Sequence, residues 1–169
     1  LFFDTDFEQH AVEIYDEPQL PKNPLFYANF SSITDSDLAP EGKEVGFFLI
    51  PVAVDLEDNQ DVHDRYFELI MDRIQKNTDV DLRKHVLFKK SFGVKDFKER
   101  YHSCRGNAYG LANTLLQTSI LRPQIDNKKI KNLFYTGQLT VPGPGVPPAL
   151  ISGKVVTDYI LKNQHRILK

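Results

Sequence analysis

The chain contains a loop rich in glycine and proline, residues 137–148 with the sequence GQLTVPGPGVPP, which is well suited to bind a ligand. Glycine has no side chain, so Gly143 and Gly145 would let a ligand approach the main chain closely. Pro147 and Pro148 have a fixed φ and no N–H group, which suits the first turn of a helix. The free N–H groups and the dipole of such a helix favour an anion or an electron-rich carbonyl.

This loop is expected to join a short buried strand to the last helix. Residues 133–135 are apolar and β-prone, and Gly137 ends the strand where the chain must turn. The helix is predicted to run from Pro148 to about Lys162. Its buried side is expected to carry Ile151, Val155, Tyr159 and Ile160. From the residues alone, an ordinary strand-to-helix connection with a rigid loop explains the pattern equally well.

The rest of the chain alternates short strands with amphipathic helices, which predicts an α/β or α+β fold. The surest helix covers residues 59–78, where apolar side chains recur on one face. A first helix starting near Phe7 is expected to be capped by Asp4 or Thr5. The other predicted elements are strands over 1–3, 25–32, 44–54 and 85–92, a helix over 94–102, and a loop passing into a helix over 106–118.

Composition excludes several classes of function. The chain has 169 residues and a net charge of −2, which gives no general reason to expect nucleic-acid binding, because proteins of that class usually show a basic face. Cys104 is the only cysteine, and the five histidines are scattered singly, so no disulfide and no metal site is predicted. There is no G-x-S-x-G elbow, no G-x-G-x-x-G turn and no apolar run long enough to span a membrane.

The 135–152 segment resembles the C-terminal FAD-contacting motif of bacterial-type phytoene desaturases, within the flavin amine-oxidase-like superfamily. The family pattern is tyrosine, any residue, Gly-Gln, then Pro-Gly-x-Gly-Val-Pro, then Leu-Ile-Ser. Leu139 and Val141 depart from it, standing where glycine and histidine are frequent. The matching positions are Tyr135, Gly137, Gln138, Pro142, Gly143, Gly145, Val146, Pro147, Leu150, Ile151 and Ser152.

The resemblance implies the C-terminal part of a two-domain, Rossmann-like flavoenzyme. It places residues 1–102 in an antiparallel-sheet substrate domain and residues 103–169 in a segment that completes the FAD domain. The missing phosphate-binding turn is expected in the absent N-terminal part, so the chain reads as the final third of a longer desaturase and is expected to be inactive alone. The residues assigned to FAD by resemblance are Gly137, Gln138, Gly143, Gly145, Val146, Pro147 and Pro148. GNAYGLANTLLQT, residues 106–118, also resembles the family, and Tyr109 and Leu111 are weaker candidates for the substrate cavity wall.

The activity implied is FAD-dependent desaturation of a long carotenoid, with hydride transfer from a C–C single bond flanking the polyene to the flavin. No residue of this chain is assigned a catalytic acid or base role. The expected partners are a carotenoid, a membrane surface and the rest of the same enzyme, in a cytoplasmic protein bound peripherally to the membrane. Two alternatives stay open: a related flavoenzyme, such as a carotenoid isomerase, saturase or ketolase, and a non-catalytic lipid-binding module that lost the flavin.

Overall fold

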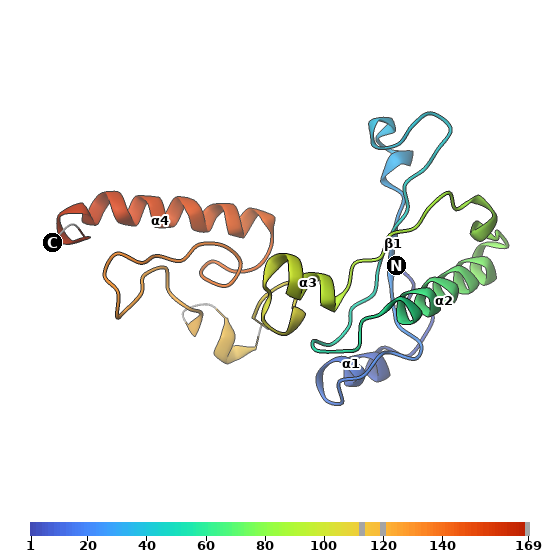
Figure 1. Ribbon diagram of the computed structural model, residues 1–169, viewed down its shortest axis with the longest axis horizontal. Helices are drawn as coiled ribbons and strands as arrows, with labels where there is room; N and C mark the ends of the chain where they lie inside the picture. Colours follow the sequence, from blue (N-terminus) through green and yellow to red (C-terminus); the bar gives the residue numbers. More distant parts are fainter. Residues whose placement is uncertain (112–113, 119–120, 168–169) are drawn as a thin grey trace. The chain divides into compact units, whose positions relative to one another are not determined.

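The computed structural model describes residues 1–111, 114–118 and 121–167, without the side chains of residues 165–167, and the chain forms two compact units (Figure 1). The first unit is Leu1–Gly106 and the second is Asn107–Lys169. No helix within the described residues is long and apolar enough to cross a membrane.

The sheet of the first unit has two short antiparallel strands, β1 (Tyr27–Asn29) and β2 (Phe47–Leu49). The two strands are shorter than the strands predicted over 25–32 and 44–54. The strand predicted over 25–32 ends early because Ser31–Ile33 forms a 3-10 helix, η1, which is followed by a second one, η2 (Ser36–Leu38). An isolated bridge between Phe2 and Phe26 is all that forms of the predicted opening strand.

Helix α2 (Gln60–Thr78) supplies one side of the core of this unit (Figure 1). Asn59 caps it by accepting the N–H of Val62 at 2.9 Å, so the predicted helix is confirmed. The buried residues of the core come from α2 and from the segment before β1, with the ring of Phe2 stacked 4.3 Å from that of Phe26. They are Phe26, Ile70, Met71 and Ile74.

Helix α1 (Phe7–Tyr15) forms as predicted, but its cap is Asp6 and not Asp4 or Thr5. The Asp6 carboxylate accepts the N–H groups of Glu8 and Gln9, at 2.9 and 3.3 Å. Asp4 is instead engaged by Arg73 on α2, a long-range contact that local capping rules do not consider.

The predicted strand over residues 85–92 is wrong. Its first residue ends a 3-10 helix, η3 (Leu82–His85), which is tied to α2 by Arg83 through Glu68 and Asp72. The residues after η3 have no strand partner among the described residues, so no ladder forms. The next helix, α3 (Val94–Tyr101), confirms the prediction, and the 3-10 helix η4 (Cys104–Gly106) follows it.

The second unit is built around α4 (Val146–Ile167), which has an irregular position at Asn163. Asp126 pairs with Phe134 in an isolated antiparallel bridge, so residues 133–135 do not form the expected buried strand. Leu133 and Tyr135 are each about 40% exposed. Within the helix predicted over part of 106–118, the structure describes one 3-10 turn, η5 (Leu115–Gln117). Residues 112 and 113 lie outside the described residues.

Candidate functional site

A folded-back chain segment delivers the glycine- and proline-rich loop to α4. Tyr135 donates its N–H to the carbonyl of Ile125 at 2.8 Å, and Asn127 donates to the carbonyl of Leu133 at 3.0 Å. The side chain of Asn127 accepts the N–H groups of Lys129 and Ile130, both at 2.8 Å, and so closes the turn between the paired segments. The loop therefore leaves from a hydrogen-bonded base even though no regular strand forms.

Gly137 is the most open position at the start of the loop. Its φ of 103° lies in the region that favours glycine, and a Cβ atom added there would have no heavy atom within 4 Å. Its N–H donates to Ser152 Oγ at 2.7 Å and its carbonyl accepts the N–H of Thr140 at 3.4 Å. Gly137 therefore offers a ligand room for close contact, while its own polar groups already have partners.

The loop ends at a helix start that differs from the prediction. The carbonyl of Gly145 accepts the N–H of Ala149 at 3.0 Å, so α4 begins at Val146 and not at Pro148. Pro147 and Pro148 then occupy the second and third helical positions, where they contribute no N–H group. Among the described residues, the amides of Gly145 and Val146 have no partner. The expected row of free amides is reduced to these two.

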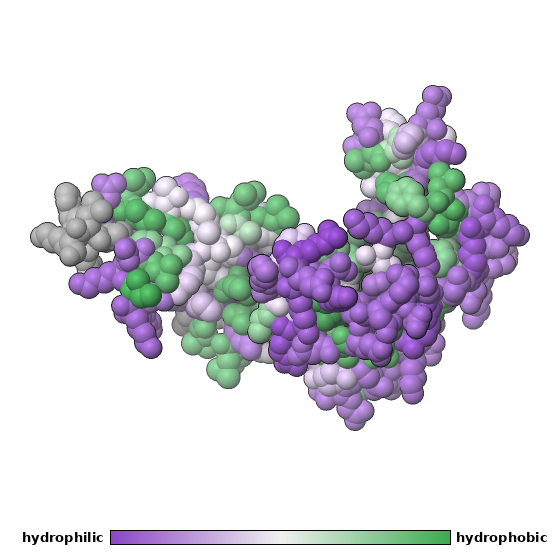
Figure 2. Space-filling view, viewed as in Figure 1, coloured by the Kyte–Doolittle hydropathy of each residue, from purple (hydrophilic) through white to green (hydrophobic). Residues whose placement is uncertain are grey.

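The predicted buried side of α4 is partly wrong. Ile151 is 51% exposed and Val155 is 39% exposed. Ser152 is fully buried instead. Tyr159 and Ile160 are half-buried, and the ring of Tyr159 packs edge-on against that of Phe134 with ring centroids 6.0 Å apart. Figure 2 shows apolar groups on the surface over the beginning of α4. The exposed apolar side chains there include Val146 and Leu150, at 75% and 73%.

The second family-like segment lies against the first. Gln138 Nε2 donates to the carbonyl of Ala108 at 3.3 Å, and Asn107 accepts the N–H of Gly110 at 2.7 Å to fix the turn between them. Tyr109, one of the two candidates for the cavity wall, is 65% exposed at this turn, and Leu111 is half-buried beside it. The hydrogen bond between Gln138 and Ala108, which are 30 residues apart in the sequence, brings the two segments together.

Sequence reasoning missed Arg122. This residue is only 3% exposed and lies behind the loop, where a Cβ atom at Gly143 would be 3.3 Å from Arg122 Nη1. With a φ of 139°, Gly143 is favoured both by its backbone and by this close approach. The nearby side chain of Thr140 is buried too, and donates to the carbonyl of Pro123 at 2.7 Å. An arginine next to a proline gave no periodic signal from which this packing could be predicted.

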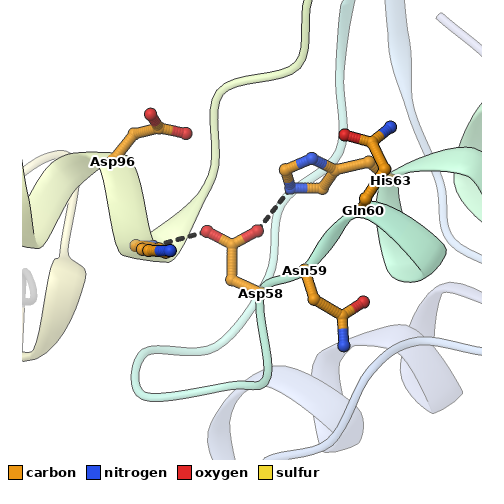
Figure 3. A pocket seen from close by; sticks show the side chains of 6 residues that line it. Asp58, Asn59, Gln60, His63 and Asp96 are labelled. Atoms are coloured by element: carbon orange, nitrogen blue, oxygen red, sulfur yellow. Dashed lines mark hydrogen bonds and ion pairs between the residues drawn. The ribbon is translucent and has the colours of Figure 1, made fainter.

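A polar pocket of about 190 Å³ in the first unit is a different kind of site (Figure 3). Asp58 points toward both the ring of His63 and the start of α3, where it accepts the N–H of Lys95. A Cβ atom on Gly93 would lie 2.6 Å from the Asp58 carboxylate. Each contact of Asp58 thus has a structural purpose, which is to cap α3 and join it to α2. Within the described part of the chain, no group of three or more metal-ligating side chains occurs.

Comparisons with known proteins agree with the resemblance seen in the motifs. No family model matches the chain. It is 40% identical over 163 residues to a carotenoid 3,4-desaturase of Haloarcula japonica, covering 96% of this chain and 33% of that protein. It is 32% identical to a 4,4'-diapolycopen-4-al dehydrogenase of Metabacillus indicus, with the same coverage of 96% and 33%. A 4,4'-diapophytoene desaturase of Staphylococcus aureus is 31% identical over 174 residues, which cover 98% of this chain and 34% of that protein.

The chain therefore spans about a third of the length of the curated relatives that it matches. The matched region covers both compact units, including the 106–118 and 135–152 segments. The resemblance to carotenoid desaturases that the motifs indicate is confirmed, because relatives that match nearly the whole chain carry desaturase names. The assignment of individual loop residues to a cofactor stays a prediction.

Proposed function

We propose that this chain, which is a homologue of the carotenoid desaturases over nearly all of its length, forms part of an FAD-dependent enzyme that desaturates a long carotenoid. The observation that carries the proposal is the geometry at Gly137. This residue combines a positive φ, open space in front of its Cα atom and a position next to the loop around Tyr109. A flat ring system can approach such a main-chain surface without meeting a side chain.

The loop residues divide into two kinds of proposed cofactor contact. Gly137 and Gln138 would provide the close surface, because both polar main-chain groups of Gly137 already bond within the protein. Gly145 and Val146 would provide the hydrogen bonds, because their amides have no partner in the described structure and lie at the positive end of α4. Gly143, Pro147 and Pro148 would hold the loop in shape.

FAD, when bound, supplies the oxidant that accepts a hydride from the C–C bond beside the polyene. This chain would contribute positioning and exclusion of water. Exposed apolar side chains near the loop, among them Tyr109 and Leu139 at 65% and 53% exposure, suit contact with a hydrocarbon or with the rest of the enzyme. No acid or base from this chain is assigned to the reaction.

The same relationship suggests how the two units take part. We propose that residues 1–102 belong to the substrate-binding domain and that residues 103–169 complete the FAD domain. The boundary between the two compact units, which follows Gly106, lies close to this division. Because a carotenoid dissolves in lipid, we also propose a cytoplasmic enzyme that takes up its substrate at the membrane surface while bound peripherally.

One of the relatives suggests an alternative reaction, the oxidation of a carotenoid aldehyde. One relative is named a diapolycopenal dehydrogenase and shares 32% identity over the same part of the chain. An enzyme that oxidises a carotenoid aldehyde is therefore the second candidate. Product analysis of the intact protein with phytoene, lycopene and a terminal carotenoid aldehyde separates the two: a longer polyene supports desaturation, and a carboxylic acid supports the alternative.

The cofactor is tested by visible absorbance of the intact protein that contains this chain. We expect the intact protein to show a flavin spectrum. Gly137→Ala should reduce the flavin absorbance, because the added methyl group would occupy the open space at Gly137 that the flavin is proposed to approach. Gly42→Ala is the matched control, since Gly42 also has a positive φ, 68°, and open space but lies outside the site. A colourless protein that cannot be reconstituted with FAD would contradict the proposal and would favour a lipid-binding module.

A further inference from the structure

The hydroxyl group of Ser152 connects the beginning of the loop to the helix at its end. Ser152 lies in the second turn of α4 and is 0% exposed. Its Oγ lies 2.6 Å from the carbonyl oxygen of Ala149, 2.7 Å from the amide nitrogen of Gly137 and 2.8 Å from Thr136 Oγ1. Thr136 and Gly137 lie 16 and 15 residues before Ser152 in the sequence, so the serine links the two ends of the chain segment that contains the whole loop.

The direction of each hydrogen bond follows from counting protons. A carbonyl oxygen can only accept, so Ser152 must donate its single proton to Ala149. Ser152 Oγ then has two lone pairs left, and the amide of Gly137 can only donate to one of them. Thr136 must therefore donate its hydroxyl proton to the other. The Ser152 hydroxyl is fully satisfied, with one bond donated and two accepted.

The hydrogen bond to Ser152 sets the orientation of Gly137. Because its N–H is directed toward Ser152, the open face of its Cα atom is held on the side where a Cβ atom would meet no heavy atom within 4 Å. The helix whose first turn contains the free amide of Val146 is the same helix that carries Ser152. One buried hydroxyl thus fixes the surface at Gly137 relative to the amides at Gly145 and Val146.

We propose that Ser152 is a positioning residue for the flavin site, which sets the separation between the close-contact surface at Gly137 and the amides at the start of α4. The inference rests on the proposed function, because it requires that a flavin bind there. Ser152 itself is buried and makes no ligand contact. Its effect is transmitted through the Gly137 amide.

The test uses Ser152→Ala, Ser152→Thr and Thr136→Val in the intact protein, with Thr157→Ala as the matched control. Thr157 lies on the same helix and donates to the carbonyl of Gly153 at 2.9 Å, so it has a similar hydroxyl bond without a link to the loop. The measurements are the dissociation constant for FAD, the visible spectrum of the bound flavin and the thermal midpoint of the protein without flavin.

We expect Ser152→Ala to weaken FAD binding roughly tenfold, the loss expected for about one buried hydrogen bond, and to shift the bound-flavin spectrum. Ser152→Thr keeps the hydroxyl and should restore both, while Thr157→Ala should leave both unchanged. Thr136→Val tests the same junction from the other side with almost no change in shape, and it is expected to weaken binding less, because the Gly137 bond remains.

The inference is overturned if Ser152→Ala binds FAD with the wild-type constant and spectrum, or if it lowers the thermal midpoint without changing either flavin measurement. If Ser152→Thr fails to fold, the comparison of Thr136→Val with Thr157→Ala decides, and equal FAD binding in these two variants would overturn it as well. Failure of the wild-type protein to bind FAD would instead reject the proposed function.

Discussion

Gly110 lies against the side chain of Leu139, so that a Cβ atom at position 110 would be 2.6 Å from Leu139 Cδ2. The φ of Gly110 is 84°, which a residue with a side chain rarely adopts. The contact joins the turn around Tyr109 to the loop after Gly137. The leucine at position 139 is accommodated because position 110 has no side chain.

Replacing Gly110 by alanine should therefore destabilise the protein through two separable effects. The positive φ costs roughly 1–2 kcal/mol for a residue with a Cβ atom, and the contact with Leu139 adds to this until the leucine changes rotamer. Urea unfolding of the protein without flavin measures the sum. In a Leu139→Ala background the same substitution should show only the backbone cost. Wild-type stability for Gly110→Ala would contradict the close approach.

The pocket around Asp58 allows a sharper steric test, because the φ of Gly93 is −133° and imposes no strain on a larger residue. Gly93→Ala should push the Asp58 carboxylate away from the start of α3, since the new methyl group would lie 2.6 Å from its oxygens. A loss of about 1–2 kcal/mol is expected, as for removal of a helix cap.

Asp58→Ala should cost a similar amount by removing the same cap. If both substitutions act on one interaction, adding Gly93→Ala to Asp58→Ala should cost little more, and urea unfolding of the double variant measures this. Fully additive losses would show that Gly93 acts independently of Asp58. Asn59→Ala is a suitable comparison, since it removes the cap of α2, where Asn59 accepts the N–H of Val62 at 2.9 Å.

The helices were predictable from sequence because their signals are local. Apolar periodicity located α2 and α3, and the range of 59–78 predicted for α2 differs from the observed helix only by including its cap, Asn59. Strands are defined by a partner, which local sequence does not contain. Residues 85–92 have strand-like composition, but after η3 they form no ladder within the described residues.

The candidate site shows the same distinction at the scale of single residues. The motif identified the glycines, and three of them, Gly137, Gly143 and Gly145, do have positive φ angles. It did not predict that Pro147 and Pro148 would occupy the second and third positions of α4, where they reduce the number of N–H groups available to a ligand. It also did not predict the burial of Arg122, because the contact with Gly143 crosses more than 20 residues of chain.

Asp55 predicts a dependence of stability on pH. Hydrogen bonds from Lys98 and then Arg105, both at 2.6 Å, lower the pKa of the Asp55 carboxyl below its ordinary value. A carboxyl whose pKa is lower in the folded state stabilises the fold above its unfolded pKa of about 4. This contribution is lost as the pH falls through the lower, folded pKa.

The test compares urea midpoints of the wild type and Asp55→Asn between pH 7 and pH 2. Asparagine suits the left-handed backbone at this position, where φ is 59°, so the substitution removes mainly the charge. The midpoint of Asp55→Asn should fall less with acidification, and 1 M salt should reduce the difference between the two proteins, since the pair is exposed. Identical pH profiles would mean that the carboxylate contributes nothing.

The guanidinium group of Arg73 makes contacts that the ammonium group of lysine cannot reproduce. Its guanidinium group bonds to Asp4 and to the carbonyl of Pro24, and lies 4.8 Å from the centre of the Phe26 ring. It therefore ties the N-terminal segment to α2 through three different kinds of contact. Lysine keeps the charge but cannot make the forked hydrogen bonds or stack on the ring in the same way.

Arg73→Lys should lower the free energy of unfolding by about 1–3 kcal/mol, the range for hydrogen bonds to charged groups. Arg73 also lowers the pKa of Asp4, chiefly by hydrogen bonding, so acidification below about pH 4 should remove part of the difference between the wild type and the variant. Arg65→Lys is the control, because Arg65 also lies over a ring, that of Tyr66 at 5.2 Å, on the same helix. Equal losses in both variants would mean that the aromatic contact, and not the link to Asp4 and Pro24, determines the effect.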